Sequence, residues 1–214
     1  MEDAKKCSKR FWLIPVIAVV AVAAIVIGAV LILDRPQKPY DDSTPEGTAQ
    51  RFLEAYYTRD YVTRFSMTYH NSRQAWEDQT VKVQGSAEAF FALAQQQADE
   101  RGIEAEIHSF DDYYACYYRF IQEDIQRMYG NHTLTVQVTE SKKMEPDNLA
   151  KRKADALNAI DAKYIDAAGL DTITEGYTVN LTIRIDGDKK TFSEHYYVHV
   201  INHNGQWKVI DHTI

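Results

Sequence analysis

The fold is decided near the C-terminus, where residues 177–211 read YTVNLTIRIDGDKKTFSEHYYVHVINHNGQWKVID. In the first part of this stretch apolar side chains alternate with polar ones, the pattern of a half-buried strand. Asp186-Gly187-Asp188 and His203-Asn204-Gly205 are typical of hairpin turns, because glycine and asparagine accept the backbone angles that tight turns need. We therefore expect three antiparallel strands, over 177–185, 192–202 and 207–211.

One more strand is predicted upstream of this meander. Leu134, Val136 and Val138 alternate with polar residues, so one face of the strand is expected to be buried. Between it and the meander, Pro146 favours the start of a helix that the pattern carries to about Ala168. The side chains expected to face inward from that helix are Leu149, Leu157, Ile160 and Tyr164.

The first half of the domain is predicted to be helical. Thr44-Pro45-Glu46 is typical of a helix start, with Thr44 as N-cap and Glu46 favourable to the helix dipole. Asp60 is expected to cap a short helix that ends near Phe65, and Ser86 a longer one that ends near Arg101.

Two further segments of this half differ in how clearly they are patterned. Residues 67–85 are weakly patterned, and 81–83 favour a short strand. The clearest helix covers 111–129, because apolar side chains recur there at spacings of three and four. Helices that mostly precede antiparallel strands predict an α+β domain, with helices packed on one face of a curved antiparallel sheet.

The N-terminal segment predicts a membrane protein. From Phe11 to Leu33 the chain carries no charged side chain. As a helix this segment would be about 34 Å long, at ~1.5 Å per residue, enough to cross the hydrocarbon core. The basic residues of 1–10 indicate a cytoplasmic N-terminus and an extracellular C-terminal part. A cleaved signal peptide is the alternative; the length of the apolar run and the lack of small residues at a cleavage position in 29–34 count against it.

Charge is unevenly distributed along the chain, and the sequence predicts four parts. The net charge is −7, and because residues 1–33 carry +2, the remainder carries −9. An acidic extracellular domain is a poor binder of nucleic acid, since it has no excess of cations to displace counter-ions from phosphates. Cys7 and Cys116 are expected on opposite sides of the membrane and cannot pair within one chain. The expected parts are a basic tail (1–10), a transmembrane helix (11–33), a stalk (34–43) and the extracellular domain (44–214).

Two stretches carry a resemblance to a known family. TPEGTAQRFLEAYYTRDY (44–61) and YYVHVINHNGQWKVID (196–211) resemble the nuclear transport factor 2-like superfamily. The layout is similar to that of membrane-anchored ectodomains of clostridial-type Gram-positive bacteria. The resemblance covers about residues 44–212 and implies a cone-like domain with a pocket. The superfamily contains enzymes, transport adaptors and immunity proteins, so the resemblance does not decide the function. The helix predicted over 146–168 is extra to the minimal cone and is expected to fill or cover the pocket.

No metal or cofactor site is predicted. His195, His199 and His203 recur at intervals of four, but in a strand neighbours at that spacing lie about 13 Å apart, too far to share one ion. Asp186 and Asp188 lack the other ligands of a calcium loop. Phosphate-binding, nucleophile-elbow and paired-cysteine motifs are absent from the sequence.

Two functional hypotheses follow. The preferred one is a non-catalytic binding or accessory module, tethered outside the cell, that holds a protein, a peptide or a small apolar ligand. The alternative is a tethered pocket enzyme of the isomerase or hydratase type, which needs a buried carboxylate and a tyrosine. Candidates for that catalytic role are Asp60, Tyr56, Tyr118 and Glu194. The expected ligand or partner surface of the binding module consists of Tyr114, Tyr117, Tyr118 and Tyr196.

Overall fold

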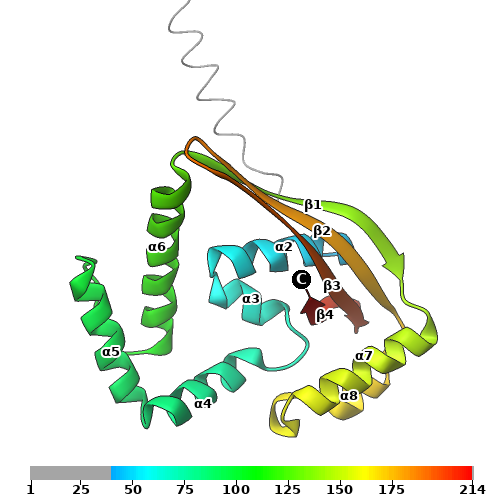
Figure 1. The fold of residues 1–214 in the computed structure, drawn as a ribbon. Coiled ribbons are helices and arrows are strands. Elements are labelled where there is room, and N and C mark those ends of the chain that lie inside the picture. The colour runs from blue at the N-terminus through cyan, green and yellow to red at the C-terminus, as the bar shows by residue number, and fades with distance from the viewer. Residues whose placement is uncertain (1–39, 214) are drawn as a thin grey trace, which may run out of the picture. The chain divides into compact units, whose positions relative to one another are not determined.

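The computed structural model describes residues 40–213, which form one compact unit (Figure 1). The predicted tail and transmembrane helix, and residues 34–39 of the stalk, lie outside this part. Within it, no helix has the length and apolar character needed to cross a membrane. The α-helices are α2 (Pro45–Thr58), α3 (Tyr61–Met67), α4 (Ser72–Gln84), α5 (Ala87–Glu100), α6 (Phe110–Tyr129), α7 (Pro146–Ala159) and α8 (Ala167–Asp171). A 3-10 helix, η1 (Ala162–Tyr164), lies between α7 and α8, and the strands are β1 (His132–Lys143), β2 (Gly176–Gly187), β3 (Thr191–His203) and β4 (Gln206–Thr213).

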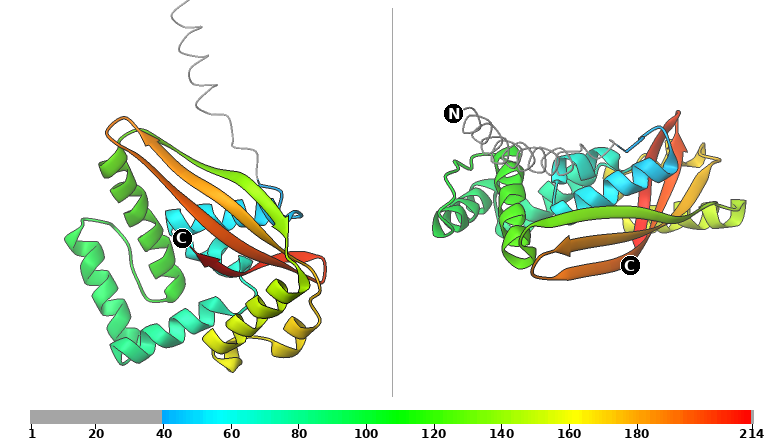
Figure 2. Two further views of the ribbon diagram at one scale, coloured as in Figure 1. Left: turned by 45° about the vertical axis from the view of Figure 1, so that its right-hand side comes forward. Right: turned by 90° about the horizontal axis from the view of Figure 1, so that it is seen from above.

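The four strands form one antiparallel sheet in the order β1-β2-β3-β4, so the α+β class is confirmed. Val179 lies opposite Val198, and Val200 opposite Val209, which places apolar side chains of three strands on the same face. Register shifts occur in β1 beyond Val138 and between β3 and β4. Such bulges bend and twist strands, as the curved ribbons of Figure 2 show.

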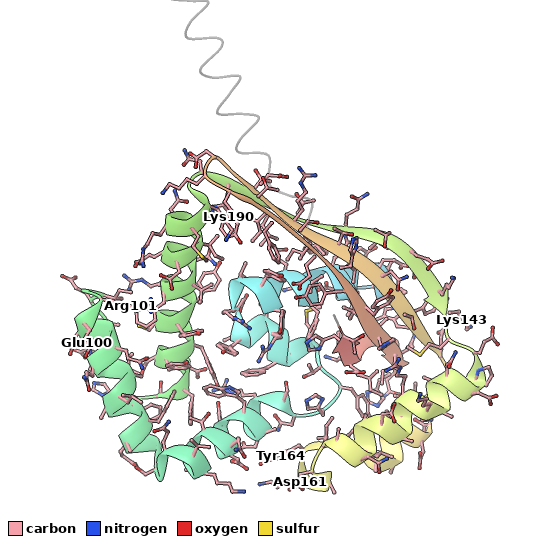
Figure 3. All side chains as sticks on the ribbon, in the orientation of Figure 1. Glu100, Arg101, Lys143, Asp161, Tyr164 and Lys190 are labelled. Atoms are coloured by element: carbon pink, nitrogen blue, oxygen red, sulfur yellow. The ribbon has the colours of Figure 1, made fainter. Side chains whose placement is uncertain are left out.

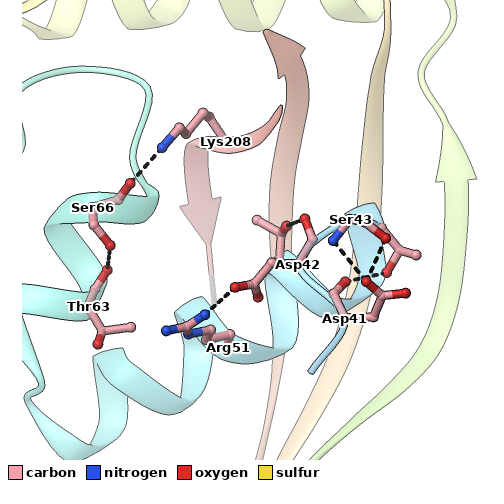
Figure 4. Close-up of polar contacts among 9 residues, drawn as sticks. Asp41, Asp42, Ser43, Arg51, Thr63, Ser66 and Lys208 are labelled. Carbon is pink, nitrogen blue, oxygen red and sulfur yellow. Dashed lines mark hydrogen bonds and ion pairs between the residues drawn. The ribbon is translucent and has the colours of Figure 1, made fainter. Parts of the chain in front are cut away.

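Helix α2 covers this apolar face of the sheet (Figure 2). Thr44 caps the helix as predicted, because its Oγ1 accepts a hydrogen bond of 3.0 Å from the Gly47 amide. Phe52 and Leu53 are buried with the strand residues in one hydrophobic cluster. Residues 41–43 of the predicted stalk form a turn that leads into α2: Ser43 N and Oγ both donate to Asp41, and Asp42 pairs with Arg51 (Figure 4).

The prediction for 67–85 was wrong: this segment contains the helix α4 and no strand at 81–83. Asn71 caps α4 by accepting from Gln74 N. None of the α4 residues is fully buried, and a helix with no fully buried face leaves little apolar periodicity in its sequence.

The helix predicted over 146–168 is also shorter than expected. Ile160, with φ −112° and ψ 129°, ends α7 in an extended conformation. Asp161 and Asp166 then cap two new short helices by accepting from Lys163 N and Gly169 N. Leu157, which was expected to face inward, is 38% exposed on α7. Helices α7 and α8 pack against β3 and β4 through Leu149, Leu170, Ile201 and Ile210.

Helices α4, α5 and α6 form a second region, which we call the helical lobe. Trp76, Phe90, Phe110 and Tyr113 of the lobe have ring centroids 4.7–6.0 Å apart. Trp76 and Tyr114 extend this ring cluster to Tyr61 and Phe65 of α3.

Besides this ring contact with α3, the lobe meets the rest of the domain at two further places. At one, the hairpin between β2 and β3 contacts the end of α6: Lys189 N donates to Tyr129 O at 3.1 Å, and Lys190 Nζ lies 5.2 Å from the Tyr129 ring centroid (Figure 3). At the other, Asp78 of α4 accepts from Lys163 Nζ at 2.8 Å and from Tyr164 OH at 2.6 Å.

Candidate functional site

A cavity of about 410 Å³ lies between α3, α7 and β4. Its apolar wall comes from three separate elements, so no single stretch of sequence encodes it. Its remaining lining is polar and is contributed mainly by α3, by the segment that follows α3, and by the end of β4. The apolar lining residues are Phe52, Ala156, Ala159, Ile160, Val209 and Ile210. The polar ones are Arg64, Thr68, His70, Ser72, Asp155, Asp211 and His212.

Hydrogen bonds fix the α3 side of this cavity to the edge strand β4. Tyr69 N donates to Val209 O at 2.9 Å, and Thr68 forms an isolated parallel bridge with Val209. Lys208 Nζ donates to Ser66 O at 2.7 Å (Figure 4). The α7 side is attached by an ion pair of 3.2 Å between Arg152 and Asp211. Both walls are therefore attached to β4, and the cavity lies between them.

Arg64 of α3 lies in an aromatic setting at this cavity. Its guanidinium carbon is 4.7 Å from the Tyr61 ring centroid, 5.2 Å from that of Phe65 and 5.9 Å from that of Tyr56. Burial lowers the pKa of the Arg64 guanidinium below its ordinary value, although arginine stays protonated in proteins. Among residues 40–213 no carboxylate forms an ion pair with it, and the rings supply only cation–π attraction.

Two histidines of the lining are neutral at pH 7. Burial lowers the pKa of His212, and the positive charge of Arg64 acts in the same direction, while Asp211 opposes both. The His212 ring lies 5.2 Å from Phe52 and 5.0 Å from Tyr56. Burial also lowers the pKa of His70. A neutral imidazole can donate one hydrogen bond and accept one, so both rings are available to a polar ligand group.

The two lining carboxylates are not reactive bases. Asp211 is neutralised by Arg152 and accepts a 2.7 Å hydrogen bond from His212 N. Asp155 is exposed on α7 at the rim. A carboxylate becomes a strong base when it is buried without a partner, and neither residue meets that condition.

The side chains predicted for acid–base catalysis do not meet at this cavity. Asp60 accepts from Thr63 N and so acts as the cap of α3, as predicted. Tyr56 contacts Arg64 through its ring. Tyr118 is 40% exposed on α6. Glu194 lies on β3, and like the other three it is not part of the cavity lining.

Glu194 does form a carboxylate–tyrosine cluster, elsewhere on the sheet. It accepts hydrogen bonds of 2.6 Å from both Tyr57 and Tyr196. These bonds lower the pKa of Glu194, because each one stabilises the ionised carboxylate. Burial and the nearby carboxylate raise the pKa of Tyr196 to about 12. The cluster is therefore stable as a carboxylate with two neutral phenols, which makes Glu194 a weak base.

The tyrosines predicted as a ligand or partner surface are divided among three places. Tyr114 is 2% exposed, and its OH donates to Glu77 at 3.1 Å. Tyr117 stacks on Tyr113 at a centroid distance of 5.5 Å, within the same ring cluster. Tyr118 lies exposed on α6, whereas Tyr196 belongs to the core under the sheet. The structure thus brings Tyr114 and Tyr117 together but not the set of four.

The histidines of β3 do not form a metal site. His199 is buried, and its Nδ1 lies 3.1 Å from Thr178 Oγ1. His195 pairs in the same way with Thr182 Oγ1 at 2.8 Å. Throughout residues 40–213 no three His, Cys, Asp or Glu side chains lie close enough together to hold a metal ion.

The sequence pattern did not indicate the residues that give the cavity its character. Arg64 lies in the predicted short helix that Asp60 caps, and His212 lies near the end of β4, but no local signal in the sequence indicates that either side chain is partly buried. No protein-family model, curated protein or solved structure matches the chain. The geometry of residues 40–213 is therefore the basis for the functional proposal.

Proposed function

We propose that this domain is a non-catalytic binding or accessory module that holds a small, mainly apolar ligand in the cavity between α3, α7 and β4. The observation that carries the proposal is the cavity itself. Its volume of about 410 Å³ is within the range of small-molecule sites, and it combines an apolar wall with a few convergent polar groups.

A second candidate is a pocket enzyme of the isomerase or hydratase type. The observation that favours it is His212, a lining residue with a lowered pKa that can accept a proton at neutral pH. The state of the carboxylates supports the binding module instead. Asp211 is paired with Arg152, and Glu194 is stabilised as an anion away from the cavity.

We place the module outside the cell, tethered by a transmembrane helix at 11–33 with a cytoplasmic N-terminus. The uncharged stretch of 11–33, the basic tail before it and the acidic remainder of the chain support this location. We also propose that the domain is a cone-like member of the nuclear transport factor 2-like superfamily. The packing of α2 on the apolar face of the bulged four-stranded sheet supports that assignment.

The test blocks the cavity and compares binding. Ala159 lies at the last position of α7 and lines the cavity, so Ala159→Trp places an indole in its mouth. Ala154 is exposed on the same helix and does not line the cavity, so Ala154→Trp is the matched control. The neutral probe is 4-phenylbutanamide, titrated calorimetrically into the full chain.

We expect Ala159→Trp to abolish binding of the probe and Ala154→Trp to leave it unchanged. Equal binding by both variants would contradict the proposal. The enzyme candidate is favoured instead if the chain converts a bound compound and His212→Asn stops the conversion without weakening binding.

A further inference from the structure

Arg64 lines the cavity and forms no ion pair within residues 40–213, in contrast to Arg73 and Arg152. Arg59 and Arg119 also form no ion pair in this part of the chain, but they do not line the cavity. Arg73 pairs with Glu77 at 2.7 Å, and Arg152 pairs with Asp211 at 3.2 Å. Arg64 has no such partner within residues 40–213, although it is more buried than a surface arginine and lines a cavity. A partly buried cation without a counter-ion is costly, and an anion bound in the cavity would offset that cost.

We infer that the ligand carries one negative charge, a carboxylate on an apolar body, and that Arg64 is its counter-ion. This inference rests on the proposed function and adds the chemical class of the ligand. The carboxylate would lie against the Arg64 guanidinium, whose planar donors match the two carboxylate oxygens.

The immediate surroundings of Arg64 suit an anion. The positive charge of Arg64 disfavours protonation of the nearby His212, and the neutral His212 ring can donate a hydrogen bond to the same anion. Thr68 and Ser72, whose hydroxyl oxygens are 2.6 Å apart, line the same cavity, but the Thr68 hydroxyl lies within donating distance of the Phe65 and His70 carbonyls and belongs to the wall. The rings of Tyr61 and Phe65 fix the guanidinium in place before the ligand arrives, which reduces the entropy lost on binding.

The rest of the lining limits the ligand to a single charge. The Asp211 carboxylate is already neutralised by Arg152, so Arg64 is the only cation of the described lining without a carboxylate partner. The exposed carboxylate of Asp155 at the rim would repel a second negative charge. Phe52, Ile160 and Val209 form the apolar wall along which the body of the ligand would pack.

The test compares two probes that differ in charge and little else. Both 4-phenylbutyrate and its amide, 4-phenylbutanamide, are titrated into the full chain, and the dissociation constants are measured by calorimetry. We expect the carboxylate to bind at least about tenfold more tightly, because a hydrogen-bonded charge pair is worth that factor or more. In Arg64→Gln the carboxylate should lose this advantage, while the affinity for the amide stays the same.

Arg59→Gln is the matched control. Arg59 also lies over the Tyr56 ring, at 5.1 Å, but does not line the cavity. We expect it to bind both probes as the unaltered chain does. Arg64→Lys keeps the charge without the planar fork and should retain an intermediate preference for the carboxylate. Circular dichroism in the near ultraviolet checks that each variant is folded.

The outcomes separate this inference from the proposed function. If the unaltered chain binds both probes equally well and Ala159→Trp blocks both, the cavity binds a ligand but the charge inference is wrong. If neither probe binds, both proposals are wrong. If Arg64→Gln does not fold, the comparison of the two probes on the unaltered chain and on Arg64→Lys decides the question.

Discussion

The sheet region and the helical lobe of this domain are stabilised by different kinds of core. Under the sheet, α2 buries aliphatic side chains completely: Leu53 and Val198 are both 0% exposed. In the lobe, stacked and tilted aromatic rings replace them, and Trp76 and Tyr113 remain partly exposed. Aliphatic burial scales with the area removed from water, whereas each ring pair adds only about 0.5–1.5 kcal/mol beyond that area.

The candidate site belongs to the sheet region and not to the helical lobe. The cavity lies beside β4. Of the helical lobe, only Ser72 at the start of α4 is among the described lining residues. Rings of the lobe support the cavity indirectly, since Tyr114 and Trp76 pack against Tyr61 and Phe65, which in turn contact Arg64. The aromatic helix α6 thus acts as a support for α3 in this account and is not itself the binding surface.

The largest expected effect comes from a leucine under the sheet. Leu53→Ala should lower the free energy of unfolding by about 2–5 kcal/mol, because it leaves a cavity in a closed core. Leu93→Ala in α5 is the matched change in the lobe, where the side chain is 41% exposed, and should cost less than about 1 kcal/mol. Urea unfolding measures both, and equal losses would contradict the difference in burial between these two leucines.

The next effect is acid destabilisation through His199 in the sheet. Burial, chiefly, lowers its pKa to about 4, against an ordinary value of 6.5. The unfolded chain therefore takes up this proton first, and stability falls as the pH drops from 6.5 to 4, by as much as about 3 kcal/mol. Urea unfolding across this range should give a shallower slope for His199→Gln. His195→Gln, an exposed position on the same strand, should keep the original slope; an unchanged slope in His199→Gln would contradict this account.

A smaller effect is expected where the two regions meet. A side chain on Gly187 would collide with the backbone carbonyl of Tyr129 at the end of α6. Gly187→Ala should therefore force the β2–β3 hairpin away from the lobe and lower the free energy of unfolding by about 1–3 kcal/mol. Ser193→Ala, at an exposed position of β3, serves as the control. A stability loss no greater than that of the control would mean that the regions are loosely joined here.

The smallest effect comes from removing one helix cap in each region. Thr44 caps α2 and Ser86 caps α5, each with a side-chain oxygen that accepts from a backbone amide. Thr44→Ala should cost about 1 kcal/mol in global unfolding, since α2 is part of the sheet core. Ser86→Ala should mainly increase amide hydrogen exchange in the first turn of α5 and change global stability less. A larger loss of global stability in Ser86→Ala than in Thr44→Ala would indicate that the helical lobe has the more cooperative core.

The elements that were predicted correctly are those with a clear local pattern in the sequence. The strands were predicted because one face of each is buried. Apolar and polar side chains therefore alternate in the sequence, as over 177–185. The caps Thr44, Asp60 and Ser86 were predicted because capping is a local interaction. Helix α4 was missed because none of its residues is fully buried, so its sequence has no clear apolar period.

Local sequence patterns did not predict the candidate site. Its walls come from α2, α3, α7 and β4, and the first two of these helices are far from α7 and β4 in the sequence. Arg64 belongs to a seven-residue helix and reads as an ordinary surface arginine. Its burial and its lack of a carboxylate partner result from tertiary packing, which a sequence pattern does not record.

The most direct test is a high-resolution crystal structure of the full chain with 4-phenylbutyrate. We expect density for the probe between α3, α7 and β4, with a carboxylate oxygen about 2.7–3.2 Å from a guanidinium nitrogen of Arg64. The phenyl ring should lie against Phe52 and Val209. A cavity closed by its own side chains, or a probe bound only elsewhere, would contradict the account.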